Sequence, residues 1–177
     1  RGSHSRRVGP MTALYGVRQL VDGIRAVRQN TVRMAEEIPE SRYDYRPTPQ
    51  SRSVAETLVH IAWLWTADHL MHAERRLESL DGFDFPALLA MSAAEEQRTR
   101  AKAEIVDLLR TDGERWAAWV AQLSEAFLAE RVRLPDGSSV NRFEMLLGTK
   151  EHEMQHRAQL TVIERLLGIA PRPTGLA

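Results

Sequence analysis

Two histidines near the C-terminal end of the chain have the spacing of metal ligands on a helix. His152 and His156 are four residues apart, so a rotation of about 100° per residue puts them on one helix face, about 40° apart. Leu160 and Ile163 share that face, which predicts that it points into the core. Because neutral imidazole is the commonest ligand of zinc, nickel and similar ions, the pair predicts a metal site.

A third histidine is available on an earlier segment. His60 shares a helix face with Leu64 and Met71 that also predicts burial. By the same geometry, His69 and His72 lie about 180° and 120° away from His60, outside the site. Ordinary buried histidines that bond to neighbouring side chains are the alternative interpretation, and spacing alone does not bring His60 to the other two.

The same segment matches the metallopeptidase motif H-E-x-x-H. Residues 152–156 read H-E-M-Q-H, and in the motif two histidines bind zinc while the glutamate, here Glu153, activates water. The extended form of the motif needs a glycine and a third histidine, but Gln159 and Val162 stand at those positions. A peptidase is therefore a disfavoured alternative.

Composition narrows the chemistry further. The chain has no cysteine, so a metal must be held by His, Asp or Glu. Lys and Arg together number 24, as do Asp and Glu, so no net field attracts nucleic acid or an anionic membrane. With no apolar run near the roughly 18 residues of a membrane span, and no signal peptide after Met11, we expect a cytoplasmic protein without nucleic-acid or membrane partners.

The elements that must position the histidines are helices. Residues 1–10 are interpreted as an expression scar, and residues 11–177 are expected to form a single domain. Ser-x-x-Glu capping boxes at Ser53 and Ser92 predict two helix starts, and Gly168 predicts the last helix end. Helical periodicity predicts four helices, over about 12–37, 53–80, 92–123 and 141–167.

A short excursion interrupts this pattern before the last helix. Residues 131–134 and 138–140 flank the turn sequence Pro135-Asp136-Gly137, which predicts a hairpin-like segment. Four helices with mostly short connections predict an all-α fold, an antiparallel four-helix bundle. Such bundles build metal sites from side chains that point inward.

The two histidine segments resemble the DinB/YfiT-like superfamily of metal-dependent enzymes. The resemblance rests on residues 53–61, SVAETLVHI, and residues 152–160, HEMQHRAQL. The family's usual second motif is H-x-x-x-H-R-G-Q, so Ala158 replaces a common glycine. The similarity covers nearly the whole chain after residue 10 and implies a four-helix bundle, a homodimer and three metal ligands. These ligands map onto His60, His152 and His156.

Three protein ligands leave a coordination position open for water or substrate, as in catalytic sites. Several DinB-like relatives are thiol S-transferases or isomerases that use bacillithiol or mycothiol. The resemblance therefore implies transfer of a low-molecular-weight thiol to a small electrophile, with one divalent ion, zinc or nickel, as Lewis acid. A hydrolase that uses metal-bound water and a non-catalytic stress-response metal-binding bundle are the alternatives.

Polar side chains on the same helix faces are candidates for the surroundings of the metal. Glu56 lies one turn before His60, where it either accepts a hydrogen bond behind a ligand and shuttles protons or only caps its helix. Thr57, Thr149 and Gln159 are predicted to line a substrate pocket.

Overall fold

The computed structural model describes residues 15–170. The predicted expression scar at residues 1–10, residues 12–14 of the predicted first helix and both ends of the predicted domain 11–177 lie outside the described residues. The first helix was predicted from about residue 12, but Tyr15 and Gly16 are not helical and the helix begins at Val17. The elements follow one another as α1 (Val17–Glu37), η1 (Glu40–Arg42), α2 (Val54–Asp68), η2 (His69–Glu74), α3 (Phe85–Glu96), α4 (Lys102–Val120), α5 (Glu125–Ala129), β1 (Arg131–Arg133), β2 (Ser139–Asn141) and α6 (Arg142–Leu166).

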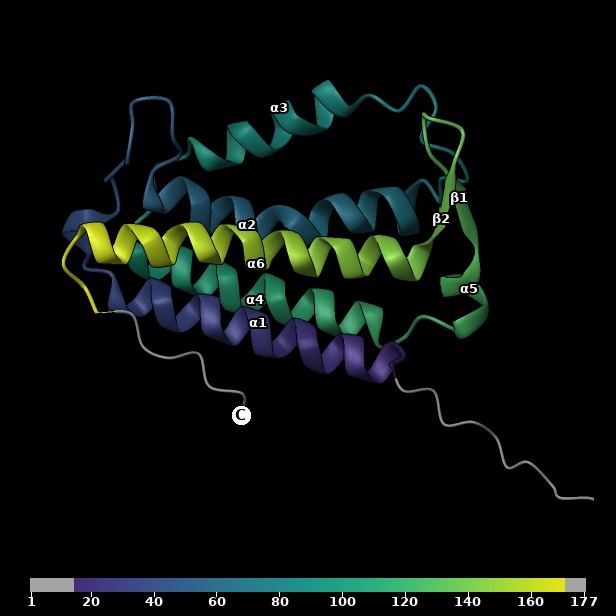
Figure 1. The fold of residues 1–177 in the computed structure, drawn as a ribbon, viewed down its shortest axis with the longest axis horizontal. Helices are drawn as coiled ribbons and strands as arrows, with labels where there is room; N and C mark the ends of the chain where they lie inside the picture. The colour runs from purple at the N-terminus through teal and green to yellow at the C-terminus, as the bar shows by residue number, and fades with distance from the viewer. Residues whose placement is uncertain (1–14, 171–177) are drawn as a thin grey trace, which may run out of the picture.

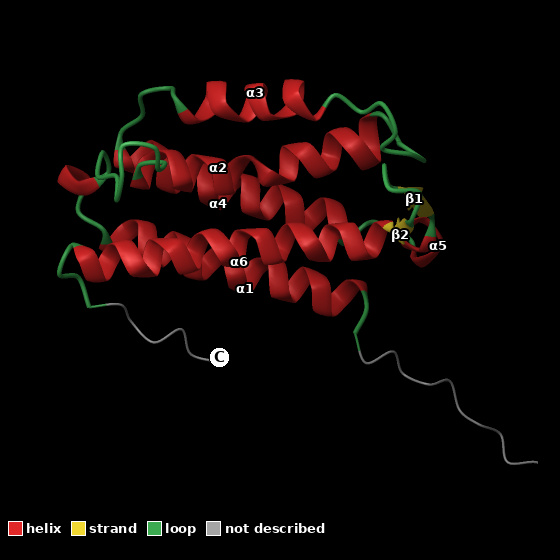
Figure 2. Cartoon of the chain, turned by 45° about the horizontal axis from the view of Figure 1, so that its top comes forward, coloured by secondary structure: helices red, strands yellow, loops and turns green. Residues whose placement is uncertain are grey.

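Four of the helices form a bundle. α1 and α2 each pack against both α4 and α6, and the predicted four-helix bundle is confirmed. In Figure 1, α1 and α6 run in one direction and α2 and α4 in the other. The chain reaches this arrangement because α3 returns along the outside of α2, as Figure 2 shows.

The predicted third helix is wrong in its bounds. A single helix was expected over residues 92–123, but the chain forms α3 and α4, with a break between them. Asp84 caps α3 by accepting a hydrogen bond from a backbone N–H in the first turn, and Pro86 stands in that turn. Ser92 therefore does not cap a helix; it lies inside α3 and donates a hydrogen bond to Glu96.

The other helix boundaries agree better with the prediction. Ser53 and Asn141 both form capping boxes, at the starts of α2 and α6. The last helix ends before Gly168, whose φ of +74° suits glycine. The second helix continues as the π-helical η2 only to Glu74, not to the predicted residue 80.

The predicted hairpin is present and is short. β1 and β2 pair antiparallel, with Val132 opposite Val140. Gly137 in the connecting turn has a φ of +83°, a conformation that glycine adopts without strain. The hairpin leads the chain directly into α6.

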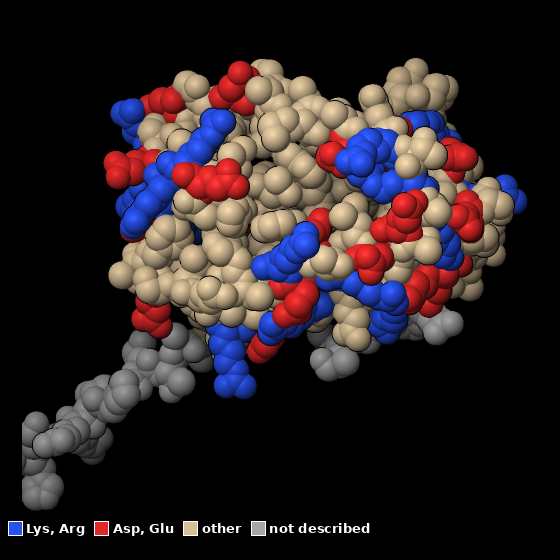
Figure 3. Space-filling model, turned by 180° about the vertical axis from the view of Figure 1, so that it is seen from behind, with Lys and Arg blue, Asp and Glu red and all other residues tan. Residues whose placement is uncertain are grey.

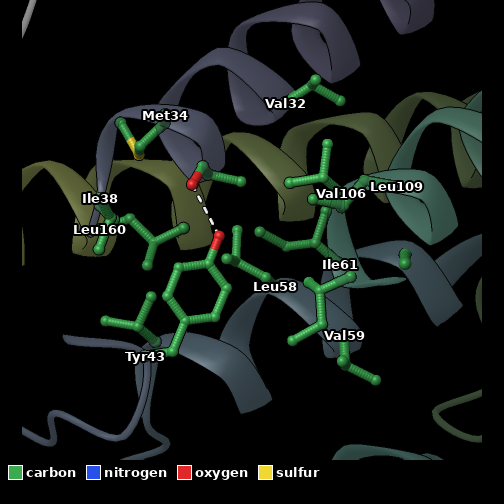
Figure 4. Packing of buried hydrophobic residues seen from close by; sticks show 14 of the residues in the cluster. Val32, Met34, Ile38, Tyr43, Leu58, Val59, Ile61, Val106, Leu109 and Leu160 are labelled. Carbon is green, nitrogen blue, oxygen red and sulfur yellow. Dashed lines mark hydrogen bonds between the residues drawn. The ribbon is translucent and has the colours of Figure 1, made fainter. Parts of the chain in front are cut away.

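The core consists of two apolar clusters with a polar layer between them. One cluster lies around the C-terminal half of α1 and the start of α2, where Tyr43 donates a hydrogen bond from its hydroxyl to the carbonyl of Ala35 at 2.6 Å (Figure 4). The other surrounds Trp116 near the start of α1. Between them on α1 and α6 lie Arg28 and Glu153, which form a buried ion pair.

The surface carries both signs of charge. On the face seen in Figure 3, basic and acidic side chains are intermixed, and many form ion pairs such as Arg25 with Glu114 at 2.7 Å. No helix within residues 15–170 has the length and apolar character needed to cross a membrane.

A buried carboxyl group predicts a pH-dependent stability. Asp68 on α2 is fully buried and accepts a hydrogen bond from Thr149 at 2.8 Å. Burial raises the pKa of Asp68 from 3.8 to about 8, although the hydrogen bond from Thr149 opposes the shift. The folded state thus holds a proton that the unfolded state releases above pH 4, so stability is full below about pH 4 and falls as pH rises towards 8.

Asp68→Asn removes this titration and keeps the acceptor for Thr149. We expect the variant to gain stability relative to the wild type between pH 5 and pH 8, by at most about 1.4 kcal/mol per pH unit. Urea unfolding of both proteins across this range measures the difference. A constant difference at all pH values would contradict the prediction.

Candidate metal centre

Three histidine side chains, one from α2 and two from α6, lie close together. His60, His152 and His156 each offer a ring nitrogen, and these nitrogens all lie within 4.8 Å of one another. The Nε2 atoms of His152 and His156 are 2.8 Å apart, and the ring centre of His60 is 4.7 Å from that of His156. The structure thus brings together the three histidines that the sequence singled out, as ligands of one ion require.

A buried arginine holds the two ligand-bearing helices in place. Arg28 on α1 donates a hydrogen bond to the carbonyl of Ile61 at 3.1 Å and to the carboxylate of Glu153 at 2.9 Å. Ile61 follows His60 in the chain, and Glu153 follows His152. Arg28 therefore links α6 to α2 through contacts next to two of the three histidines.

The contacts of Glu153 count against the peptidase interpretation of the H-E-x-x-H motif. The side chain of Glu153 is fully buried and its carboxylate accepts hydrogen bonds from Arg28 and from Thr31, the latter at 2.7 Å. Both donors to the Glu153 carboxylate come from α1, whereas the rings of His152 and His156 lie next to His60 of α2. Glu153 is not placed to activate water at the three histidines.

Hydrogen bonds behind two of the histidines orient their rings. The Nδ1 atom of His60 lies 2.8 Å from Oε1 of Glu96 and 3.1 Å from the hydroxyl of Ser92. The Nδ1 atom of His156 lies 2.9 Å from Oε1 of Gln159. An Nδ1–H that donates to these oxygens leaves the Nε2 lone pair free for a metal, which is the usual arrangement of metal-binding histidines.

The environment favours the neutral form of His152 and His156. Burial is the largest cause that lowers the pKa of His156 to about 4; the nearby His60, His152 and Arg52 add to this shift, and the hydrogen bond with Gln159 opposes it. Burial also lowers the pKa of His152, helped by His60 and Arg52. Neutral imidazoles are the form that binds metal ions.

Glu96 is the charged residue behind the site. Burial raises its pKa, but hydrogen bonds from His60, Arg52 and Ser92 outweigh burial and hold the pKa at about 2. Arg52 donates to Oε2 of Glu96 at 2.6 Å. Glu96 is thus ionised at neutral pH and aligned as an acceptor for His60.

A pocket of about 760 Å³ adjoins His156. Two of the three predicted pocket residues, Thr57 and Gln159, line it. The third, Thr149, is not among the lining residues of this pocket, and its hydroxyl donates a hydrogen bond to Asp68 at 2.8 Å. The remaining lining residues come from the loop before α2, from α3 and from α6, namely Pro47, Gln50, Ser51, Arg52, Glu96, His156, Val162, Ile163 and Leu166.

Glu56 has a different position from Glu96. Its carboxylate accepts the backbone N–H of Ser53 at 2.9 Å in the capping box and pairs with Arg46 at the surface. These contacts correspond to the helix-capping interpretation of Glu56.

The two other described histidines lie apart from the cluster, as predicted. His72 is buried against Arg142, with 3.0 Å between its Nδ1 atom and a guanidinium nitrogen. His69 packs against Trp65 and Trp119. Neither belongs to the group of ring nitrogens that converge in residues 15–170.

Sequence reasoning missed Glu96 because it placed a helix start at Ser92. The sequence Asp84-Phe85-Pro86 carries the better signal, since Asp is a favoured N-cap and Pro is common in a first turn. A helix from residue 85 puts Ser92 and Glu96 one turn apart on one face. That face is the one that reaches His60.

Glu96→Gln tests the role of this carboxylate. We expect the variant to bind zinc roughly 10–100-fold more weakly, because a neutral amide aligns and polarises the His60 ring less than a carboxylate. Competition with a chromophoric chelator measures the affinity. Glu95→Gln is the matched control, since Glu95 pairs with Arg98 and Arg100 at the surface; an equal loss in both variants would contradict the prediction.

The comparisons with known proteins agree with this fold. The chain matches the family model of the DinB superfamily over residues 24–160, which include all three histidines. The chain therefore belongs to the DinB superfamily, and the resemblance found in its two histidine segments is confirmed.

Solved structures share the fold. YjoA, a DinB-like protein from Bacillus subtilis, is 25% identical with a TM-score of 0.65, over 88% of this chain and 95% of YjoA. YfiT from Bacillus subtilis, described as "a probable metal-dependent hydrolase with an unusual four-helix bundle topology", is 17% identical with a TM-score of 0.68, over 92% of this chain and 93% of YfiT.

An enzyme of thiol chemistry has the same fold. A mycothiol-dependent maleylpyruvate isomerase is 16% identical with a TM-score of 0.64, over 85% of this chain and 63% of the isomerase. The comparison with curated proteins gave no match.

Proposed function

We propose that the chain binds one divalent ion, zinc or nickel, through His60, His152 and His156, and that it transfers a low-molecular-weight thiol to a small electrophile. The observation that carries the proposal is the convergence of three ring nitrogens within 4.8 Å beside a pocket of about 760 Å³. Three ligands leave room for a substrate atom, unlike the four ligands of a structural zinc site.

The donor set fits such an ion. Two of the three imidazoles have lowered pKa values, and two have their Nδ1 atoms at an oxygen acceptor. When bound, a divalent ion would supply Lewis acidity that lowers the pKa of a thiol or of water in the open position. Glu96 orients the ring of His60, and Gln159 orients the ring of His156.

A thiol suits this pocket better than water does. Glu96 is the only acidic residue that lines the pocket in the described part of the chain, and His60, Arg52 and Ser92 already occupy its carboxylate. Hydrolysis commonly uses a free carboxylate or histidine as general base. A thiol has an ordinary pKa of about 8.5, so it needs less help to lose its proton. The mycothiol-dependent isomerase of the same fold supports this choice.

The test is conjugation of mycothiol or bacillithiol to 1-chloro-2,4-dinitrobenzene by zinc- or nickel-loaded protein. A bond forms between sulfur and the ring carbon, chloride leaves, and the thiol proton passes to the buffer. We expect His156→Ala to lower the rate at least roughly a hundredfold, while His69→Ala retains it. Equal rates for the wild type and His156→Ala would refute the transferase; ester hydrolysis that needs His156 but no thiol would favour the hydrolase.

A further inference from the structure

Beyond His156, one side of the pocket is formed by apolar side chains, and two of those on α6 are exposed. Val162 is 54% exposed and Leu166 is 61% exposed, and both line the pocket together with Ile163 and, across from α6, Pro47. We call these four residues the apolar stripe. Val162 and Leu166 are four residues apart, so they lie on one face of α6. Their exposure contributes nothing to the stability of the bundle.

The apolar stripe is continuous with the candidate metal centre. His156, Gln159, Val162 and Leu166 follow one another on α6 at spacings of three and four residues, and all four line one pocket. The rise of a helix places Leu166 about 15 Å beyond His156. A ligand whose polar end lies at the histidines therefore extends its body along the stripe.

The charged residues that line the pocket disfavour a ligand with a charged group on the part that lies along the apolar stripe. The charged side chains among its described lining residues are Arg52 and Glu96, which pair with each other at 2.6 Å. The other polar lining residues on the loop and α2 are the neutral Gln50, Ser51 and Thr57. No unpaired charge within the described lining can neutralise an ionic group that lies along the stripe.

We infer that the electrophile of the proposed transfer is a small molecule with an uncharged, apolar body that lies on the apolar stripe and a polar head group at the three histidines. The inference rests on the proposed function for the head group and adds the chemical class of the body. The volume of about 760 Å³ lies within the roughly 300–1,000 Å³ of small-molecule pockets. The continuity of the stripe with the histidines favours a small molecule over a second copy of the chain.

The test is calorimetric titration of zinc-loaded protein with acetohydroxamic, butanohydroxamic and hexanohydroxamic acid. These probes share one metal-binding head group and differ in the length of the apolar body. We expect affinity to rise roughly fourfold for each methylene that the stripe buries. Equal affinity for all three would overturn the inference and leave the metal site intact. Binding of the longer acids without acetohydroxamic acid would support the stripe and count against the metal; no binding at any length would overturn both.

Variants locate the effect on the stripe. Val162→Asp and Leu166→Asp change exposed side chains, so the fold is retained, and each should abolish the dependence on chain length while acetohydroxamic acid binds as before. Met154→Asp is the matched control, because Met154 is a 39% exposed apolar residue of α6 outside the pocket lining. The inference would be overturned if affinity still rose with the length of the hydroxamic acid in both stripe variants. It would also be overturned if the wild type were a dimer and both stripe variants were monomers, because a second copy of the chain would then cover the stripe.

Discussion

Replacing His156 by alanine is expected to lower the zinc affinity of the protein by roughly a hundredfold or more. Loss of a ligand should exceed the 10–100-fold effect of losing a hydrogen-bond partner behind a ligand. His156 contacts both other parts of the site, since its Nε2 lies 2.8 Å from that of His152 and its ring packs against His60 at 4.7 Å. The variant leaves two ligands, which bind a divalent ion weakly.

Chelator competition measures this loss, and His69→Ala is the matched control. His69 lies on the same helical segment as His60 but packs against Trp65 and Trp119, away from the cluster. It should bind zinc as the wild type does. Zinc should also raise the melting temperature of the wild type and of His69→Ala, but not of His156→Ala, because a ligand stabilises only the state that binds it. Unchanged affinity in His156→Ala would exclude the proposed ligand set.

The histidine positions could be predicted because local rules decide them. His152 and His156 share a face in any helix, and the capping boxes at Ser53 and Asn141 fix where their helices begin. Helical phase alone does not bring His60 to the pair, because packing between α2 and α6 sets that distance. The family motifs supplied this contact from the sequence, and the geometry agrees with it.

The surroundings of the site could not be predicted in the same way. Thr149 was predicted to line a substrate pocket, but its hydroxyl donates a hydrogen bond to the buried Asp68 of α2. Glu96 reaches His60 only because α3 packs on α2, and a misplaced helix start at Ser92 hid that packing. These contacts are tertiary, so the periodicity of a single helix does not reveal them.

The buried ion pair is a second example of tertiary control. The sequence singled out Glu153 only as part of the H-E-x-x-H motif, and nothing local identified Arg28 as its partner. Gly113 on α4 also has a tertiary reason, since a Cβ atom there would lie 2.4 Å from Cγ of Arg28. The glycine leaves room for the arginine to cross α4 and reach Glu153.

Glu153→Gln should therefore destabilise the protein severely. The variant leaves the guanidinium of Arg28, whose residue is 4% exposed, buried without its counter-charge, and breaking such a pair costs about 3–5 kcal/mol. For a chain of this size the melting temperature should fall by roughly 6–20 °C. Thermal unfolding of the metal-free protein measures the change. Glu151→Gln, at an exposed position on the same helix, should stay within about 0.5 kcal/mol of the wild type.

A second variant separates the lost pairing from lost packing. Arg28→Met combined with Glu153→Leu removes both charges and keeps an apolar contact between α1 and α6, so it should recover much of the stability lost in Glu153→Gln. The double variant should bind zinc more weakly than the wild type, because it lacks the hydrogen bond from Arg28 to Ile61 beside His60 and the ion pair beside His152. Recovery of stability together with full zinc affinity would show that the ion pair stabilises the bundle without positioning the histidines.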